Sequence, residues 1–167
     1  MSEAKVKIVN MVMIYNDSGE VLALDKIHPD WGGITFPGGK VQAGESIYES
    51  AVREAKEETG LDISALEPCG IVHWAAENGE RYLEFLFRTK VYSGELCKPT
   101  HEGRCFWISR EALQSAPNLS MNFKYYLPMF FEDKYAELFF EWDGKAWDGI
   151  PQYKCCLLYT SDAADDS

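Results

Sequence analysis

Residues 38–61, GGKVQAGESIYESAVREAKEETGL, decide the fold because they predict an amphipathic helix with both of its ends marked. Ser46 is a favourable N-cap, and Glu49, three residues later, completes a capping box. Gly60 supplies the left-handed residue with which helices commonly end. We therefore predict a helix over about residues 47–59. Its buried stripe is expected to consist of Tyr48, Ala51, Val52 and Ala55.

A second stripe of this helix carries three carboxylates, those of Glu54, Glu57 and Glu58. Most charge runs are solvated faces, on which a glutamate usually has a Lys or Arg three or four residues away. Glu57 has Arg53 at that spacing, whereas Glu54 and Glu58 have no Lys or Arg there, repel each other, and are expected to have nothing nearby in the sequence that balances them. A hard divalent cation would reverse this repulsion. Periodicity and pairing alone leave a metal site and a solvated face as equal alternatives.

The segments before the helix predict two strands and a loop. Residues 5–16 and 20–26 are rich in apolar and β-branched side chains, and the turn sequence NDSG between them lets the second strand return along the first. Residues 27–40 are dense in Gly and Pro and predict a loop.

The segments after the helix predict mainly strands. Residues 69–76 and 81–92 are expected to form a hairpin with Asn78 and Gly79 at its tip. A short strand is expected over residues 104–109, followed by a helix that begins at Arg110.

The last predicted elements are a helix and a strand. The helix is expected over residues 123–135 with an interruption or a kink at Pro128, and the strand within residues 136–142. Strands outnumber helices and hairpin signals are frequent, so we predict an α+β sandwich with a mixed sheet. No internal repeat or linker is evident, and one domain over residues 5–150 is expected.

The composition limits the classes of partner. The chain has 167 residues and a formal net charge of −11. Such an acidic surface argues against binding to a nucleic acid polymer or an anionic membrane, and it suits metal cations and nucleotides that arrive with a metal. The five cysteines show no zinc-binding spacing, and the N-terminus has no apolar signal core. We therefore expect a soluble cytoplasmic protein with reduced thiols.

The segment 156–167 continues no periodic pattern of the preceding sequence. It resembles the translation of a transposon-end adapter used in preparing sequencing libraries. We expect it to be non-native, or else a disordered tail, and exclude it from the reasoning on the fold.

The spacing within the opening stretch is more specific than its helical period. Gly39, five residues, Glu45, seven residues and then the run from Arg53 to Leu61 resemble the signature box of the Nudix hydrolases. Seven fixed Gly, Glu and Arg positions match, and the departure at Ala55, where the family usually has a larger aliphatic residue, concerns packing. The resemblance implies the Nudix α/β/α sandwich with a catalytic loop–helix–loop.

The resemblance also implies roles for the residues of the box. Its metal ligands, for Mg²⁺ or Mn²⁺, would be the carbonyl of Gly39 and the carboxylates of Glu54, Glu57 and Glu58. Either Glu54 or Glu57 would orient or deprotonate the attacking water. Arg53 would orient a box carboxylate, and Glu45 would brace the junction of loop and helix at the end opposite Gly60.

Glu102, five residues before Trp107, is a further candidate. Nudix enzymes that remove damaged nucleotides place a metal-ligating or catalytic Glu at a similar point. An ordinary acidic loop residue is an equal alternative.

The flanking motifs resemble those of bacterial diphosphatases that act on oxidised purine nucleoside triphosphates, such as 8-oxo-dGTP, and release the monophosphate and pyrophosphate. Trp31 could then stack on a base, and Asn118 or Asn122 could read the purine edge, although packing and turn roles are commoner for such residues. Lys26 and Lys40 could contact phosphates or simply be solvated.

Two alternatives to this function remain. The chain could hydrolyse another Nudix substrate, such as ADP-ribose or a dinucleotide, or it could be a non-catalytic module that binds a nucleotide without turnover. The sequence is compatible with a monomer or a homodimer.

Overall fold

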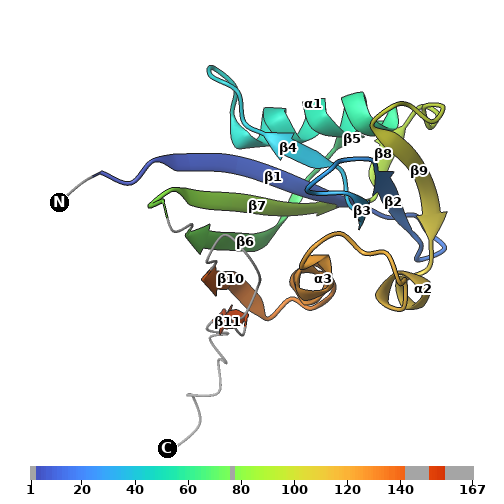
Figure 1. The fold of residues 1–167 in the computed structure, drawn as a ribbon. Helices are drawn as coiled ribbons and strands as arrows, with labels where there is room; N and C mark the ends of the chain where they lie inside the picture. Colours follow the sequence, from blue (N-terminus) through green and yellow to red (C-terminus); the bar gives the residue numbers. More distant parts are fainter. Residues whose placement is uncertain (1–2, 76–77, 142–150, 157–167) are drawn as a thin grey trace, which may run out of the picture.

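Strands form the centre of the molecule, and helices cover them from two opposite sides (Figure 1). The computed structural model describes residues 3–75, 78–141 and 151–156. The strands are β1 (Val6–Ile14), β2 (Val21–Lys26), β3 (Gly33–Thr35), β4 (Gly38–Lys40), β5 (Asp62–Ser64), β6 (Glu67–Ala75), β7 (Arg81–Thr89), β8 (Val91–Ser93), β9 (Gly103–Ile108), β10 (Tyr135–Glu141) and β11 (Gln152–Cys155). The helices are α1 (Ile47–Thr59), α2 (Arg110–Gln114) and α3 (Phe123–Phe131).

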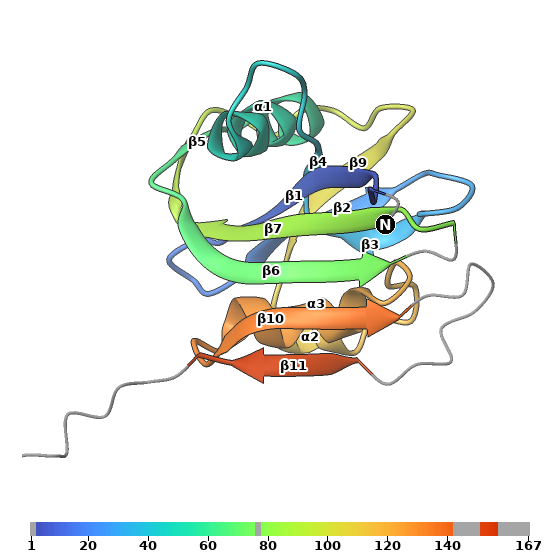
Figure 2. The ribbon, with the colours of Figure 1, turned by 90° about the vertical axis from the view of Figure 1, so that its left-hand side faces the viewer.

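The strands assemble into a mixed sheet and two smaller ones. The six-stranded sheet has the order β11-β10-β6-β7-β1-β4, in which β1 with β7 and β6 with β10 are the parallel pairs (Figure 2). A three-stranded sheet has the order β3-β2-β9, and β5 pairs with β8. This arrangement confirms the predicted α+β architecture with a mixed sheet.

Two buried apolar clusters separate the layers. One cluster joins the sheets to α2 and α3, with Phe36, Phe123 and Phe130 in edge-to-face contact at its centre. The other joins β1 and β2 to α1 through Ala51 and Ala55. Successive side chains of β1 alternate between the two clusters, so that this strand belongs to both cores.

The predicted helix is confirmed, together with both of its caps. The backbone N–H of Glu49 donates to Oγ of Ser46, and the N–H of Ser46 donates back to the Glu49 carboxylate. Gly60 ends the helix in the left-handed conformation, with φ of 81°. The buried stripe was wrong at one position, because Tyr48 is 43% exposed and the small side chain of Ser50 is buried in its place.

The strands before the helix form as expected but do not pair with each other along their lengths. A bridge between Tyr15 and Val21 closes the turn, after which β1 pairs with β7 and β4, and β2 with β3 and β9. The local turn signal was read correctly, whereas the choice of strand partner depends on packing that the sequence does not display.

The prediction of an unbroken loop over residues 27–40 was wrong, because β3 and β4 lie within it. Gly38 shows why a glycine-rich segment can pair here. A Cβ at Gly38 would lie 2.1 Å from the carbonyl oxygen of Asn10 on β1. The absent side chain therefore permits the close approach of the two backbones, despite the low strand propensity of glycine.

The hairpin after the helix is confirmed as β6 and β7, with Gly79 at φ of 80° in the turn; residues 76–77 lie outside the described ranges. The end of β7 was predicted too late, because β8 separates from it and pairs with β5. Of the two alternatives predicted at Pro128, the interruption was wrong, because α3 continues through this residue and ends at Phe131. Five buried side chains anchor α3 in the core, which outweighs the loss of one helical hydrogen bond.

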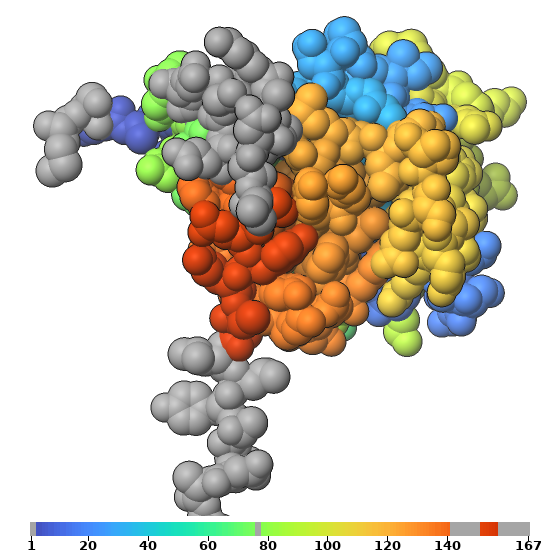
Figure 3. Space-filling view, turned by 60° about the horizontal axis from the view of Figure 1, so that its bottom comes forward, coloured from blue at the N-terminus to red at the C-terminus, as the bar shows by residue number. Residues whose placement is uncertain are grey.

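Strand β11 extends the large sheet beyond β10. The hydroxyl of Tyr153 donates to the carbonyl of Tyr125 at 2.8 Å, which fixes β11 beside the segment of α3 and β10 (Figure 3). Of the segment 156–167, only Cys156 lies within the described residues. Within the described ranges, no helix combines the length and apolar character that crossing a membrane requires.

Replacing Ser46 by Ala is expected to lower the free energy of unfolding by about 1 kcal/mol, because the N–H of Glu49 loses its acceptor at the helix start. Denaturant unfolding followed by circular dichroism measures this change. Ser18→Ala is the matched control, since Ser18 is exposed in a turn. Equal stability of the two variants would show that the capping box contributes nothing.

Candidate functional site

The carboxylate of Glu58 joins helix α1 to the three-stranded sheet and to the six-stranded sheet. Its Oε1 accepts from Nζ of Lys26 on β2 at 2.9 Å, and its Oε2 accepts from the backbone N–H of Gly38 on β4 at 2.8 Å. The Glu58 side chain is only 7% exposed. Burial raises the pKa of Glu58, whereas the Lys26 ammonium and the Gly38 N–H lower it by favouring the charged form.

Arg53 organises the opposite flank of the helix. Its guanidinium donates to both oxygens of Glu45, at 3.0 and 2.7 Å, and to Glu54 at 2.8 Å and Glu57 at 3.2 Å. It also donates to the carbonyl of Lys40 at 3.1 Å, which ties α1 to β4 a second time. The hydrogen bonds from Arg53, assisted by the Gln42 N–H, lower the pKa of Glu45 to about 2.

Gly39 and Glu54 are in direct contact. A Cβ at Gly39 would lie 2.4 Å from Cδ of Glu54, so only glycine leaves room for this carboxylate against the backbone of β4. The two elements of the signature box therefore meet where the Glu54 carboxylate packs against the backbone of Gly39.

The prediction that nothing nearby in the sequence balances Glu54 was wrong, and Glu58 is balanced by a residue that is distant in the sequence. Arg53, the adjacent residue, balances Glu54, and Lys26, 32 positions away, balances Glu58. A rule that considers partners three or four residues apart on a helix cannot find either contact. The expected pair between Arg53 and Glu57 is confirmed.

The donors of this site suit a hard divalent cation, because they are carboxylate and carbonyl oxygens. Glycine at position 39 lets the Glu54 carboxylate lie against the backbone of β4, and an oxygen ligand at this strand also fits such a group. Within the part of the chain that the structure describes, no three side chains of the ligand types His, Cys, Asp and Glu are already clustered for a metal. The carboxylates of α1 are instead held by Arg53, Lys26 and the Gly38 N–H.

The remaining predicted carboxylates are more exposed. The Glu57 side chain is 58% exposed and is held by one hydrogen bond to Arg53. Glu102 lies in the turn before β9, where its carbonyl accepts from the N–H of Ile27 and its carboxylate lies 3.8 Å from His101. No hydrogen bond or ion pair joins Glu102 to the box carboxylates among the described residues. Its position next to the end of β2 nevertheless places it near Lys26.

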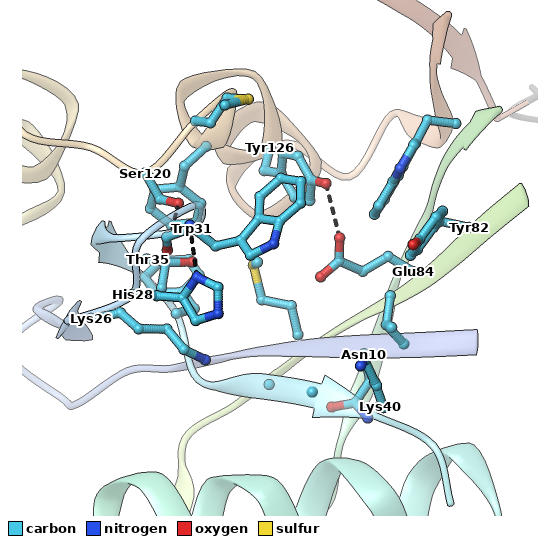
Figure 4. A pocket seen from close by; sticks show the side chains of 18 residues that line it. Asn10, Lys26, His28, Trp31, Thr35, Lys40, Tyr82, Glu84, Ser120 and Tyr126 are labelled. Carbon is cyan, nitrogen blue, oxygen red and sulfur yellow. Dashed lines mark hydrogen bonds between the residues drawn. The ribbon is translucent and has the colours of Figure 1, made fainter. Parts of the chain in front are cut away.

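A pocket of about 380 Å³ opens beside the box, between the large sheet and α3 (Figure 4). The backbone of residues 38–40 and the side chains of Lys26 and Lys40 line the end next to α1. Aromatic side chains line much of the rest, including Trp31, Trp74, Tyr82 and Tyr126. A pocket of this size and composition accommodates a small ligand with a planar ring and a charged end.

Some of the predicted substrate-binding residues line the pocket, and others do not. Trp31, 45% exposed, lines the pocket together with Lys26 and Lys40. Asn118 and Asn122 are not among the lining residues. Asn122 instead occupies the left-handed N-cap position of α3, with φ of 62°, and its side chain makes no capping hydrogen bond.

Glu84 on β7 is a pocket residue that the sequence analysis did not identify. It is 8% exposed and accepts a hydrogen bond from the Tyr126 hydroxyl at 2.8 Å. Burial raises the pKa of Glu84 to about 7, although Tyr126 and Lys26 lower it. The alternation of β7 could have identified Glu84. Its side chain is on the same face of the strand as those of Tyr82 and Leu86, which point into the molecule, and a charged residue is unexpected on such a face unless it has a function.

Comparison with known proteins agrees with this geometry. A family model described as the NUDIX domain matches residues 5–130. The uncharacterized Nudix hydrolase YvcI of Bacillus subtilis is 30% identical over 115 residues, which cover 66% of this chain and 70% of that protein. Phosphatase NudJ of Escherichia coli K12 is 33% identical over 88 residues, 50% of this chain. The chain therefore spans 56% of the length of NudJ.

Solved structures share the fold. The mutator MutT protein from Bacillus halodurans superposes with a TM-score of 0.72 at 26% identity, covering 89% of this chain and 97% of that one. The MutT protein from Methanosarcina mazei Go1 gives a TM-score of 0.65 at 25% identity, covering 78% and 96%.

Replacing Lys26 by Met is expected to lower the free energy of unfolding by about 2 kcal/mol in metal-free buffer, because the buried Glu58 carboxylate loses its cation. The double variant Lys26→Met, Glu58→Gln should recover most of this loss, since no buried charge remains unpaired. Lys90→Met, on an exposed lysine, is the control. Denaturant unfolding of the wild type, Lys26→Met, Glu58→Gln, the double variant and the control measures the coupling, and simple additivity of the two changes would contradict it.

The raised pKa of Glu84 predicts a pH-dependent stability. The ordinary pKa of a glutamate is 4.5, and the pKa of Glu84 in the folded protein is about 7. The stability that protonated Glu84 contributes is therefore fully present below pH 4.5 and is lost as the pH rises through 7. Between pH 4.5 and 8 the wild type should therefore lose about 3 kcal/mol relative to Glu84→Gln, which does not titrate. Unfolding of both proteins across this range measures the difference, and parallel pH profiles would contradict the prediction.

Proposed function

The chain belongs to the Nudix family, and we propose that it is a Mg²⁺- or Mn²⁺-dependent hydrolase of a nucleoside diphosphate-linked substrate. The observation that carries the proposal is the continuity of the site. The carboxylate-bearing face of α1 meets β4 at Gly39, and the same short strand lines a pocket with aromatic walls. One end therefore offers oxygen ligands and lysines for phosphates, and the other offers surfaces for a base.

The proposed metal ligands are the Gly39 carbonyl and the carboxylates of Glu54, Glu57 and Glu58, with Glu102 as a further candidate. A divalent cation bound there would neutralise phosphate charge and lower the pKa of water. Arg53 keeps Glu54 against β4 and leaves its orientation little freedom. Lys40, exposed at the mouth of the pocket, and Lys26 are placed to bind phosphate oxygens.

We assign proton abstraction from the attacking water to Glu57. Glu54 is packed against Gly39, and Glu58 is buried between Lys26 and Gly38, whereas Glu57 is 58% exposed with one bond to Arg53. An accessible carboxylate can accept the proton while a bond forms between the water oxygen and phosphorus. The bond between phosphorus and the bridging oxygen then breaks, and that oxygen leaves with the other product.

The preferred substrate in this proposal is a purine nucleoside triphosphate, including its 8-oxo form, cleaved to the monophosphate and pyrophosphate. The flanking sequence motifs, which resemble those of bacterial diphosphatases of oxidised purine nucleoside triphosphates, support this class over ADP-ribose and dinucleotides. Trp31 at the pocket edge would stack on the base. We place the enzyme in the cytoplasm, as a monomer or homodimer without nucleic acid polymers or membranes as partners.

A substrate panel with Mg²⁺ tests the activity. We expect pyrophosphate and monophosphate from dGTP or 8-oxo-dGTP, and slower turnover of ADP-ribose, NADH and diadenosine polyphosphates. Rapid turnover of one of the latter would assign another Nudix substrate. Tight binding of a nucleotide without hydrolysis would identify a binding module instead.

Glu57→Gln should reduce kcat by at least about 100-fold, because the water loses its base. Its stability in metal-free buffer should change by less than about 0.5 kcal/mol, since Glu57 is exposed. Glu95→Gln, on an exposed loop residue, is the control and should retain activity. A large loss of stability in Glu57→Gln would show that this residue is structural.

A further inference from the structure

Glu84 presents an acceptor to the interior of the pocket. It extends from β7 toward α3, and Figure 4 shows its carboxylate joined by a dashed line to the Tyr126 hydroxyl, in the pocket that Trp31 also lines. A buried carboxylate in an aromatic pocket is costly unless its oxygens receive hydrogen bonds. The position therefore requires either a structural partner or a ligand.

The described residues satisfy only part of this carboxylate. The Tyr126 hydroxyl donates to Oε2, and no other hydrogen bond or ion pair to Glu84 is formed within the described ranges. The nearby ammonium of Lys26 is engaged by Glu58. Since a carboxylate has about four acceptor positions, Oε1 and part of Oε2 are available to a ligand.

The strand register fixes the distance from this acceptor to the phosphate-binding end. Val9 on β1 pairs with Lys40 on one side and with Glu84 on the other. Lys40 and Glu84 are therefore two strand spacings apart, about 10 Å. This is the scale that separates the phosphates of a nucleotide from the far edge of its base.

We propose that Glu84, oriented by the Tyr126 hydroxyl, accepts hydrogen bonds from a nucleobase edge that carries two adjacent donors, and that it thereby selects guanine-type bases. This inference rests on the proposed function, because it takes the ligand of the pocket to be a nucleotide. Tyr126 acts through Glu84 and is a positioning residue.

The donor pattern of the bases identifies the class. Guanine presents N1–H and an exocyclic amino group side by side, and these match the two oxygens of a carboxylate. Adenine and cytosine present an amino group beside a ring acceptor, which would face a carboxylate oxygen unfavourably. Donors from the base also favour the ionised form of Glu84, as Lys26 and Tyr126 do. Oxidation at C8 alters the opposite side of the purine, so Glu84 accepts dGTP and 8-oxo-dGTP alike.

Steady-state kinetics of wild type, Glu84→Gln and Tyr126→Phe with dGTP, dITP and dATP test the proposal. The wild type should prefer dGTP over dITP, which lacks the exocyclic amino group, and over dATP. Glu84→Gln replaces an acceptor by a donor and suits the adenine edge, so the ratio of kcat/KM for dGTP to that for dATP should fall about tenfold or more. Tyr126→Phe keeps the carboxylate and should lower the same ratio to a smaller extent. Glu95→Gln should keep the wild-type ratio.

Two results separate this inference from the proposed function. If the nucleotides are hydrolysed but their kcat/KM ratios are the same in wild type and Glu84→Gln, the proposed function stands and the role of Glu84 is overturned. If no nucleotide is hydrolysed, calorimetric titration with dGMP and dAMP tests the inference by itself. A preference for dGMP that Glu84→Gln removes supports it, and equal affinities of the wild type for both overturn it.

Discussion

The buried carboxylate of Glu58 is the constraint on which the rest of the site depends. Through Lys26 it reaches the small sheet, and through the Gly38 N–H it reaches the edge of the large sheet. A charge this deeply buried is tolerated only where its oxygens are well satisfied, so the helix, the two sheets and the loop between them have little freedom to move apart. The backbone of β4 is consequently held at a fixed distance from the carboxylates of α1, and the same backbone lines one end of the pocket.

Residues of one chemical type acquire different roles because their surroundings differ. The pKa of Glu45 is about 2 because Arg53 and a backbone N–H hold its charged form. Burial shifts the pKa of Glu58 upward, and it raises that of Glu84 to about 7. Glu57 remains exposed beside Arg53. Desolvation and hydrogen-bond donors therefore distinguish these glutamates from one another, and the proton transfer and base recognition that we propose for Glu57 and Glu84 rest on that difference.

The sequence revealed what is local. The capping box, the glycine at the helix end and the box spacing predicted α1 to the residue and indicated the mixed sandwich. It did not reveal contacts between distant segments: Lys26 with Glu58 spans 32 positions, and Tyr126 with Glu84 spans 42. It also did not reveal the pairing partners of β1 and β2, because tertiary packing decides which strands pair. The candidate catalytic helix could therefore be predicted, whereas its electrostatic balance and the far end of the pocket could not.

Strand β1 connects the two ends of the site, because its residue Val9 lies opposite Lys40 of β4 on one side and opposite Glu84 of β7 on the other. The pairing of β1 with β4 and with β7 fixes Lys40 and Glu84 relative to each other through the backbone ladders, which do not depend on the side chains at either end. Substitutions on β7 and α3 can change the acceptors offered to a base without moving the box carboxylates, whose positions are set by Arg53, Lys26 and Gly38. The proposed phosphate cleavage and the proposed choice of base can therefore change independently on the same scaffold.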